Sequence, residues 1–183
     1  MTHLIAVHLD LRDVQSARVW GWIRALGLQA EIEARPFSLD VAEPWDCDGP
    51  TFGLELLMLM EQARDHGPEA VARLIDTAYE RIGVDAESAH AELAMWLQVG
   101  AAAELPLAEY DEEMERLKAE VGYWMAEARE DHGVIRPPTL LFDDGTTAYV
   151  QLDAPVEDPE DAQRFLALVL ERLATIDGAD RGA

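Results

Sequence analysis

Cysteine is almost absent from this 183-residue chain, because Cys47 is the only one. A lone cysteine forms no disulfide within the chain, which is typical of proteins from a reducing compartment. The apolar run at residues 4–7 is too short for the core of a secretory signal and has no cleavage pattern behind it. We therefore expect a cytoplasmic location.

Positive charge is also scarce. The chain has 14 Lys and Arg against 37 Asp and Glu, which gives a formal net charge of -23 at pH 7. The field of such a protein repels nucleic-acid phosphates and anionic lipid headgroups. In addition, no stretch of the sequence approaches the roughly 20 apolar residues of a membrane span. We expect neither a nucleic-acid partner nor a membrane partner.

Metal-ligand spacing is missing as well. The histidines show no such spacing and no paired cysteines accompany them: His3, His8, His66, His90 and His132. We therefore predict no metal site. His8 ends the first predicted strand and could titrate there, but we expect a structural histidine that is hydrogen bonded.

Apolar residues, in contrast, make up 49% of the chain, enough for one substantial core. Residues 4–7 form a short apolar run that predicts a buried strand. The N-cap residue Asp13, apolar side chains at helical spacing and Gly27 beyond the last of them predict a helix over 14–26. Alternating apolar and polar residues over 30–35 predict a second strand. The order strand, helix, strand requires these two strands to be parallel.

A loop over residues 38–50 leads into a helical block at about 51–131. Apolar stripes predict four helices in this block, of which the second opens at Pro68 and the third is capped by Asp85. The fourth helix should end before Gly133. Large side chains at core spacing are expected to pack inside the block or to line a pocket beside it: Met58, Met60, Trp96, Trp124 and Met125.

The C-terminal part begins with two predicted strands, over 139–142 and 146–152. They should form an antiparallel hairpin, because the Asp-Gly pair between them is the strongest short turn signal. Pro159 as first helical residue and the apolar stripe after it predict a final amphipathic helix. Residues 175–183 are expected to be a frayed tail.

Two motifs accompany this order of elements. They are residues 35–39, Arg-Pro-Phe-Ser-Leu, and residues 133–142, Gly-Val-Ile-Arg-Pro-Pro-Thr-Leu-Leu-Phe. Prolines at the entrance of a strand indicate a constrained loop, because proline has no N–H for the sheet ladder. With the order of elements, the motifs resemble the DsbA-like thioredoxin-fold family. The pattern is similar to cytoplasmic DsbA-like oxidoreductases and to 2-hydroxychromene-2-carboxylate isomerases.

The resemblance implies an α/β thioredoxin-like fold, β-α-β plus β-β-α, with an inserted all-helical subdomain. Residues 1–50 and 132–183 would form the thioredoxin-like domain, and residues 51–131 the helical insertion. Pro138 would then be the cis-proline of the family.

The family's redox motif Cys-x-x-Cys opens the first helix, and the matching residues here are Asp13, Val14, Gln15 and Ser16. Neither position carries sulfur, so dithiol exchange is chemically excluded in this register. The isomerase branch has a residue other than a redox cysteine at the first position of this motif and uses glutathione as cofactor. By that resemblance, Asp13 and Ser16 are candidate catalytic residues. Asp13 also has a simpler interpretation as a helix N-cap, and Ser16 as a structural residue.

The resemblance also brings Arg12 and Arg136 to the two sides of the helix start and the proline loop. Two guanidinium groups can clamp a carboxylate, and the backbone before Pro138 can hold a peptide-like ligand. The expected ligand-binding residues are therefore Arg12, Arg136, Pro137, Pro138 and Thr139. The ligand would be a small thiol or carboxylate, such as glutathione or another low-molecular-weight thiol. The two arginines could instead be surface charges paired with acids.

The sequence leaves three functions open. The first is a ligand-binding relative of the DsbA-like family without the dithiol, which could act as an isomerase-like or residual oxidoreductase-family enzyme. The second is a non-catalytic protein-protein interaction module, most simply a homodimer. The third is a thiol enzyme that works through Cys47, although the carboxylates of Asp46 and Asp48 should raise the pKa of that thiol and suppress the thiolate.

Overall fold

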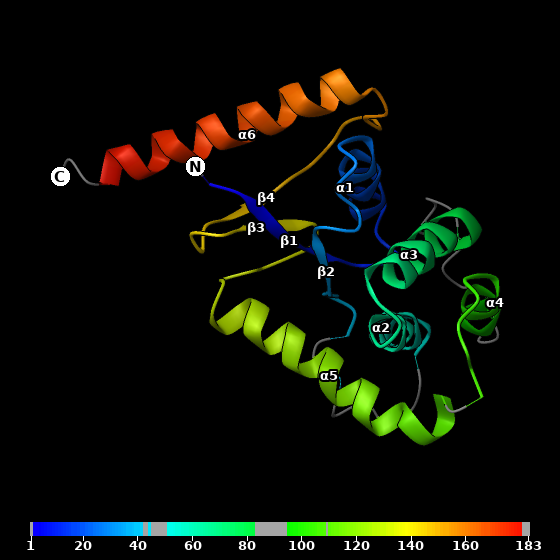
Figure 1. Ribbon diagram of the computed structural model, residues 1–183. Helices are drawn as coiled ribbons and strands as arrows, with labels where there is room; N and C mark the ends of the chain where they lie inside the picture. Colours follow the sequence, from blue (N-terminus) through cyan, green and yellow to red (C-terminus); the bar gives the residue numbers. More distant parts are fainter. Residues whose placement is uncertain (1, 42–43, 45–50, 83–94, 109, 181–183) are drawn as a thin grey trace.

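The computed structural model describes residues 2–41, 44, 51–82, 95–108 and 110–180. Over these residues the protein is a mixed α/β structure in which α1 and α6 lie on one side of a four-stranded sheet and α5 on the other (Figure 1). The elements are β1 (Leu4–Leu9), α1 (Val14–Ala25), β2 (Glu33–Pro36), α2 (Phe52–Arg64), α3 (Pro68–Ile82), α4 (Met95–Ala102), α5 (Tyr110–Glu130), β3 (Thr139–Phe142), β4 (Thr147–Tyr149) and α6 (Pro159–Asp180).

The sheet has the strand order β2-β1-β3-β4. β1 pairs in parallel with β2, as the strand-helix-strand order predicted, and β3 is antiparallel to both β1 and β4. The predicted hairpin turn is also confirmed, because Gly145 has a φ of +83° between β3 and β4. The register pairs Leu9 with Pro36, His8 with Thr139, and Thr139 with Tyr149. These residues therefore lie at one edge of the sheet, which we term the β1-end edge.

Two strands are shorter than the sequence pattern predicted. β2 starts at Glu33 and not at residue 30, because the N–H groups of Glu31 and Ile32 both bond to the carbonyl of Leu28 in a turn at 2.9 Å. The alternation therefore included residues of that turn. β4 ends at Tyr149, well before residue 152.

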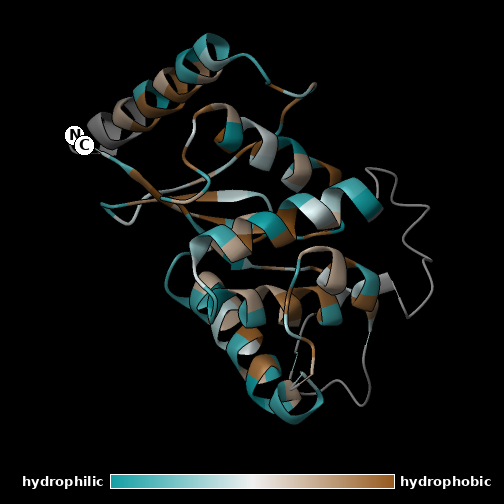
Figure 2. Ribbon diagram, turned by 45° about the vertical axis from the view of Figure 1, so that its right-hand side comes forward, coloured by the Kyte–Doolittle hydropathy of each residue, from teal (hydrophilic) through white to brown (hydrophobic). Residues whose placement is uncertain are grey.

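The final helix is longer than predicted. α6 continues to Asp180, whereas a frayed tail was expected from residue 175. Nothing in the sequence of this stretch breaks a helix outright, since it contains no proline. In Figure 2, hydrophilic and hydrophobic residues alternate along α6, as expected for an amphipathic helix. Among the described residues, no helix has both the length and the apolar character needed to cross a membrane.

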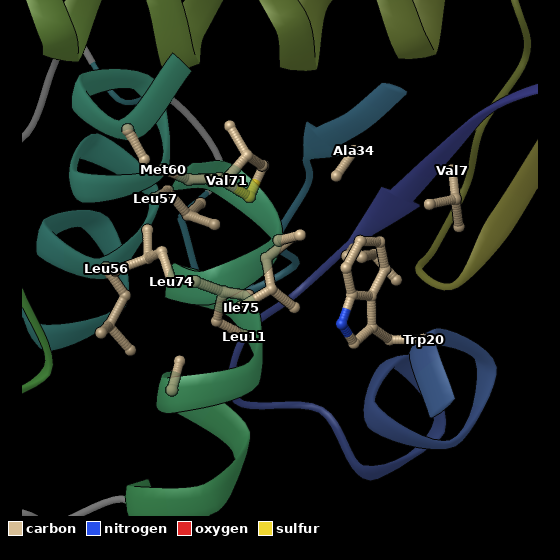
Figure 3. Packing of buried hydrophobic residues seen from close by; sticks show 14 of the residues in the cluster. Val7, Leu11, Trp20, Ala34, Leu56, Leu57, Met60, Val71, Leu74 and Ile75 are labelled. Carbon is tan, nitrogen blue, oxygen red and sulfur yellow. The ribbon is translucent and has the colours of Figure 1, made fainter. Parts of the chain in front are cut away.

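The larger of two buried clusters joins the sheet to the helical block. Trp20 from α1 and Val7 from β1 belong to the same buried cluster as Leu57 from α2 and Ile75 from α3 (Figure 3). α2 is buried on all sides from residue 53 to residue 63, including the polar side chains of Glu55, Glu61 and Gln62. The two parts of the chain that the sequence analysis distinguished, residues 1–50 with 132–183 and the insertion at 51–131, therefore share packing in one buried cluster.

Candidate functional site

The β1-end edge brings together the start of α1 and the double-proline loop. α1 begins a few residues after β1 ends, and the loop leads directly into β3, the other neighbour of β1. The peptide bond between Pro137 and Pro138 is cis, so the cis geometry expected at Pro138 is confirmed. The N–H of Val150, just beyond β4, donates to the carbonyl of Pro138 at 3.2 Å. The predicted site residues are thus gathered at one edge of the sheet.

Asp13 is the N-cap of α1. Its backbone is extended, and its Oδ2 accepts hydrogen bonds from the N–H of Ser16 at 2.7 Å and from the Ser16 hydroxyl at 2.8 Å. One carboxylate oxygen of Asp13 therefore accepts a hydrogen bond from a free N–H of the first turn of α1. The same oxygen fixes the hydroxyl of Ser16, the residue that matches the second cysteine of the redox motif. The N-cap role predicted from the sequence is confirmed.

Ser16 is completely buried. Its hydroxyl donates to Asp13 and accepts from the N–H of Asp10 at 3.2 Å. The only proton of the hydroxyl is committed to an internal hydrogen bond. In this arrangement Ser16 offers no exposed nucleophile to a ligand.

Asp10 lies beside Asp13 and Ser16, and together they form a hydrogen-bonded cluster. The sequence analysis did not identify Asp10 as a site residue. Its Oδ2 accepts from the hydroxyl of Ser38 at 2.7 Å, and its Oδ1 accepts from the N–H of Arg12 at 2.9 Å. Burial raises the pKa of Asp10, while the hydrogen bonds from Ser38 and Arg12 act in the opposite direction. The available signal was its position: an acidic residue directly after a buried strand lies at the edge where functional side chains often gather.

Tyr79 from α3 reaches the same cluster. Its hydroxyl donates to the backbone carbonyl of Asp10 at 3.2 Å. Burial raises the pKa of Tyr79 far above its usual value, and the carboxylates of Asp10 and Asp13 add to this shift. Tyr79 therefore stays protonated and acts as a hydrogen-bond donor that fixes the helical block to the end of β1.

Arg12 and Arg136 contact different partners. Arg12 forms an ion pair with Asp40, just beyond β2, at 3.3 Å between Nη1 and Oδ2, and its side chain is 25% exposed. The exposed Arg136 stacks on the ring of Tyr149 in β4, with 4.2 Å between its guanidinium carbon and the ring centroid. β2 and β4 are the two outer strands of the sheet. The two guanidinium groups thus lie toward opposite outer strands, and a clamp would require them to move or the ligand to span them.

The proline loop offers acceptors more than donors. The hydroxyl of Thr139 donates to the carbonyl of Arg136 at 2.7 Å, which fixes the loop to the start of β3. Pro137 and Pro138 are buried, and Pro137 has no N–H, so the carbonyl is the only backbone hydrogen-bonding group of the residue before the cis bond. A ligand that pairs with this backbone must therefore donate a hydrogen bond to it.

Two other expectations concern sulfur and metals. Cys47 lies outside the described residues, together with Asp46 and Asp48. Within the described part of the chain, no group of three His, Cys, Asp or Glu side chains is placed to hold a metal ion.

Comparisons with known proteins identify no family for this chain. No protein-family model matches the sequence, and no curated protein matches it. A function for this chain must therefore be inferred from its own residues.

Proposed function

We propose that this protein is a thioredoxin-fold member of the DsbA-like family that binds a small thiol or carboxylate ligand at the β1-end edge. The sheet order β2-β1-β3-β4, with only β3 antiparallel to β1 and with α1 connecting the parallel pair, supports this fold. The helical block between β2 and β3 is where the family resemblance puts its insertion. The single cysteine supports a cytoplasmic location as part of the same proposal.

One observation carries the proposal. The start of α1 and the cis bond between Pro137 and Pro138 lie at the same edge of the sheet, on neighbouring strands. Arg12 and Arg136 lie on the two sides of this junction. A ligand placed there would meet the carbonyl of Pro137 as an acceptor and a guanidinium group as a partner for its carboxylate.

The proposed activity is binding without dithiol exchange. The two positions that match the redox motif hold Asp13 and Ser16, which are hydrogen bonded to each other and carry no sulfur. Isomerase-like chemistry through Ser16 would require this buried hydroxyl to leave both of its partners. The geometry therefore supports a ligand-binding protein better than an enzyme.

Titration with glutathione by isothermal calorimetry tests the proposal. Arg136→Ala should weaken binding by about tenfold, because it removes a charged hydrogen-bond partner of the ligand carboxylate. Arg164→Ala is the matched control, since Arg164 is an exposed arginine on α6 that pairs only locally with Asp161. Absence of binding at millimolar glutathione, or equal losses in both variants, would contradict the proposal.

A gain-of-function variant tests the register on which the proposal rests. Asp13→Cys combined with Ser16→Cys puts two thiols where the present side chains already touch at 2.8 Å. We expect this variant to form a disulfide that dithiothreitol reduces, and the dithiol to pass its two electrons to the disulfides of insulin. Insulin turbidity measures the reaction. A variant that folds but reduces insulin no faster than the wild type would show that the register is wrong.

Exposed apolar side chains at the same edge favour the second candidate, a protein-protein interaction module. Leu39, which follows β2, is 61% exposed, and Ile135, in the proline loop, is 75% exposed. Such residues are typical of the centre of a contact surface, and a second copy of the chain is the simplest partner. Sedimentation equilibrium with Ile135→Asp distinguishes this function: a dimer that the substitution dissociates would support it, and a monomer at all concentrations would count against a homodimer.

A further inference from the structure

We propose that a second site, on the outward face of α1, binds a small apolar carboxylate. A cleft of about 410 Å³ lies between α1 and the linker that follows β4. It is lined by Val14, Ala17, Arg18, Gly21, Pro155, Val156 and Glu157. The cleft shares only Val14, the first residue of α1, with the segment that matches the redox motif, and none of the candidate catalytic or ligand-binding residues lines it. The inference therefore does not depend on the function proposed above.

The cleft exists because α1 carries small residues on one face. The opposite face buries large side chains in the core, among them Val19 and Ile23. Ala17 and Gly21 are one helical turn apart on the outward face, and a Cβ added at Gly21 would meet no atom within 4 Å. Gly21 therefore leaves open space where another residue would fill the cleft.

The far wall is held in place by two hydrogen bonds to α1. The N–H of Leu152 donates to Oε1 of Gln15 at 2.9 Å, and Nη1 of Arg18 donates to the carbonyl of Leu152 at 2.6 Å. These bonds tie the linker after β4 to α1 before it turns into α6 (Figure 1). Pro155 adds rigidity, because its ring fixes the backbone φ. The cleft is thus formed before any ligand arrives.

Arg18 gives the cleft its charge preference. One of its five N–H groups bonds to the Leu152 carbonyl, and no carboxylate among the described residues lies within 4.0 Å of it. Arg18 and Arg24 are the only charged residues of α1, in a chain whose net charge is -23. A guanidinium fixed by one bond, with donors to spare, is suited to a carboxylate.

The size and lining of the cleft define the apolar part of the ligand. A volume of about 410 Å³ lies in the range of small-molecule sites. Ala17, Gly21 and Val156 form an apolar surface against which a phenyl ring can pack. Glu157 is exposed at the rim and has no ion pair with any described residue, so it should repel an anion weakly. The best probe is therefore a small aryl acid.

Ligand-observed and protein-observed NMR titration with phenylacetate tests the site. Phenylacetamide, without the charge, and phenethylamine, with the opposite charge, are the matched probes. We expect phenylacetate to bind at least about tenfold more tightly than either, because only the carboxylate accepts charged hydrogen bonds from Arg18. Equal affinities for the acid and the amide would overturn the proposal.

Variants locate the binding. Gly21→Phe should abolish phenylacetate binding by filling the cleft, whereas Gly21→Ala should keep most of it. Arg18→Gln should weaken binding about tenfold, and Glu157→Gln should leave it unchanged or tighten it. Full binding by Gly21→Phe or by Arg18→Gln would refute the site. If Gly21→Phe fails to fold by circular dichroism, Arg18→Gln and the amide probe still decide. Glutathione binding by these variants shows whether the two sites are separate.

Discussion

The two faces of the sheet bury different kinds of side chain, although β1 contributes residues to both faces. On the side of α1, Val7 and Leu9 of β1 join the large apolar core. On the side of α5, the intervening His8 lies next to Phe37, with 6.3 Å between the ring centroids. Phe37 itself belongs to a small separate cluster. The alternation of a strand thus lets one segment stabilise one face by apolar packing and place an ionisable group inside the other.

His8 departs from what the sequence led us to expect. Both ring nitrogens are buried and have no hydrogen-bond partner, so the expectation of a hydrogen-bonded histidine was wrong. Burial, followed by the charges of Arg35 and His132, lowers the pKa of His8 from 6.5 to about 3. Glu127 of α5 is the nearby acid, but it pairs with Arg35 at 3.4 Å and lies 3.7 Å from His132. In the folded protein the His8 side chain is therefore uncharged at pH values above about 3.

The largest effect is expected on the apolar face. Trp22 of α1 is fully buried, packs edge-to-face on Phe165 of α6 and donates from Nε1 to the carbonyl of Ala162 at 3.0 Å. Trp22→Ala should lower the free energy of unfolding by roughly 3–5 kcal/mol, because it leaves a large cavity and removes the hydrogen bond from Nε1 to Ala162. Urea denaturation at pH 7 measures this change. Trp22→Phe keeps the ring packing and should lose much less; equal losses would show that packing is not the main term.

The second effect is a pH dependence of the free energy of unfolding that comes from His8, on the α5 side of the sheet. Between pH 6.5 and about 3 the unfolded chain protonates His8 and the folded chain does not, so stability falls as the pH falls. At pH 4 this loss amounts to about 3 kcal/mol relative to pH 7. His8→Leu removes the titration, so its stability should fall less between the two pH values. At pH 7 the same variant should be more stable than the wild type by roughly 1–3 kcal/mol, since two unsatisfied nitrogens are replaced by an apolar group.

The comparison between variant and wild type is needed because Asp10 titrates in the opposite sense. Its pKa is raised in the folded protein, so the folded state holds the proton more tightly and stability falls as the pH rises through that pKa. Both proteins contain Asp10, and its contribution cancels in the difference. Parallel pH profiles of the wild type and His8→Leu, measured by urea denaturation, would contradict the assignment to His8.

The sequence predicted the order of the elements well, because the signals for them are local. Asp13 and Gly27 at the ends of α1 mark boundaries by their own conformational preferences, and the structure agrees with both. The lack of hydrogen-bond partners at His8 and the burial of Asp10 depend on residues more than 60 positions away in the sequence, such as His132 and Tyr79. No spacing rule in one sequence gives such contacts. The sequence therefore predicted where the site lies in the fold, but it did not predict the hydrogen bonds that Asp10 forms there.

The smallest effect tests whether charge stabilises the α5 face. Trp124 of α5 contacts two guanidinium groups, with 4.7 Å from the Cζ of Arg35 and 4.9 Å from the Cζ of Arg64 to the ring centroid. Its Nε1 donates to buried Glu61 at 2.9 Å. Trp124→Leu should cost about 1–2 kcal/mol in urea denaturation, because it removes two cation–π contacts that are partly shielded from water and the hydrogen bond to Glu61.

Tyr149→Leu is the matched variant, since within the described part of the chain Tyr149 has a single cation–π contact, with the exposed Arg136. It should cost less than about 1 kcal/mol. Arg35 comes from β2 and Arg64 from α2, so the ring of Trp124 connects α5 to the sheet and to the buried helix at once. If the two variants lose the same amount, the second guanidinium adds nothing, and the α5 face is stabilised by apolar contacts much as the α1 face is.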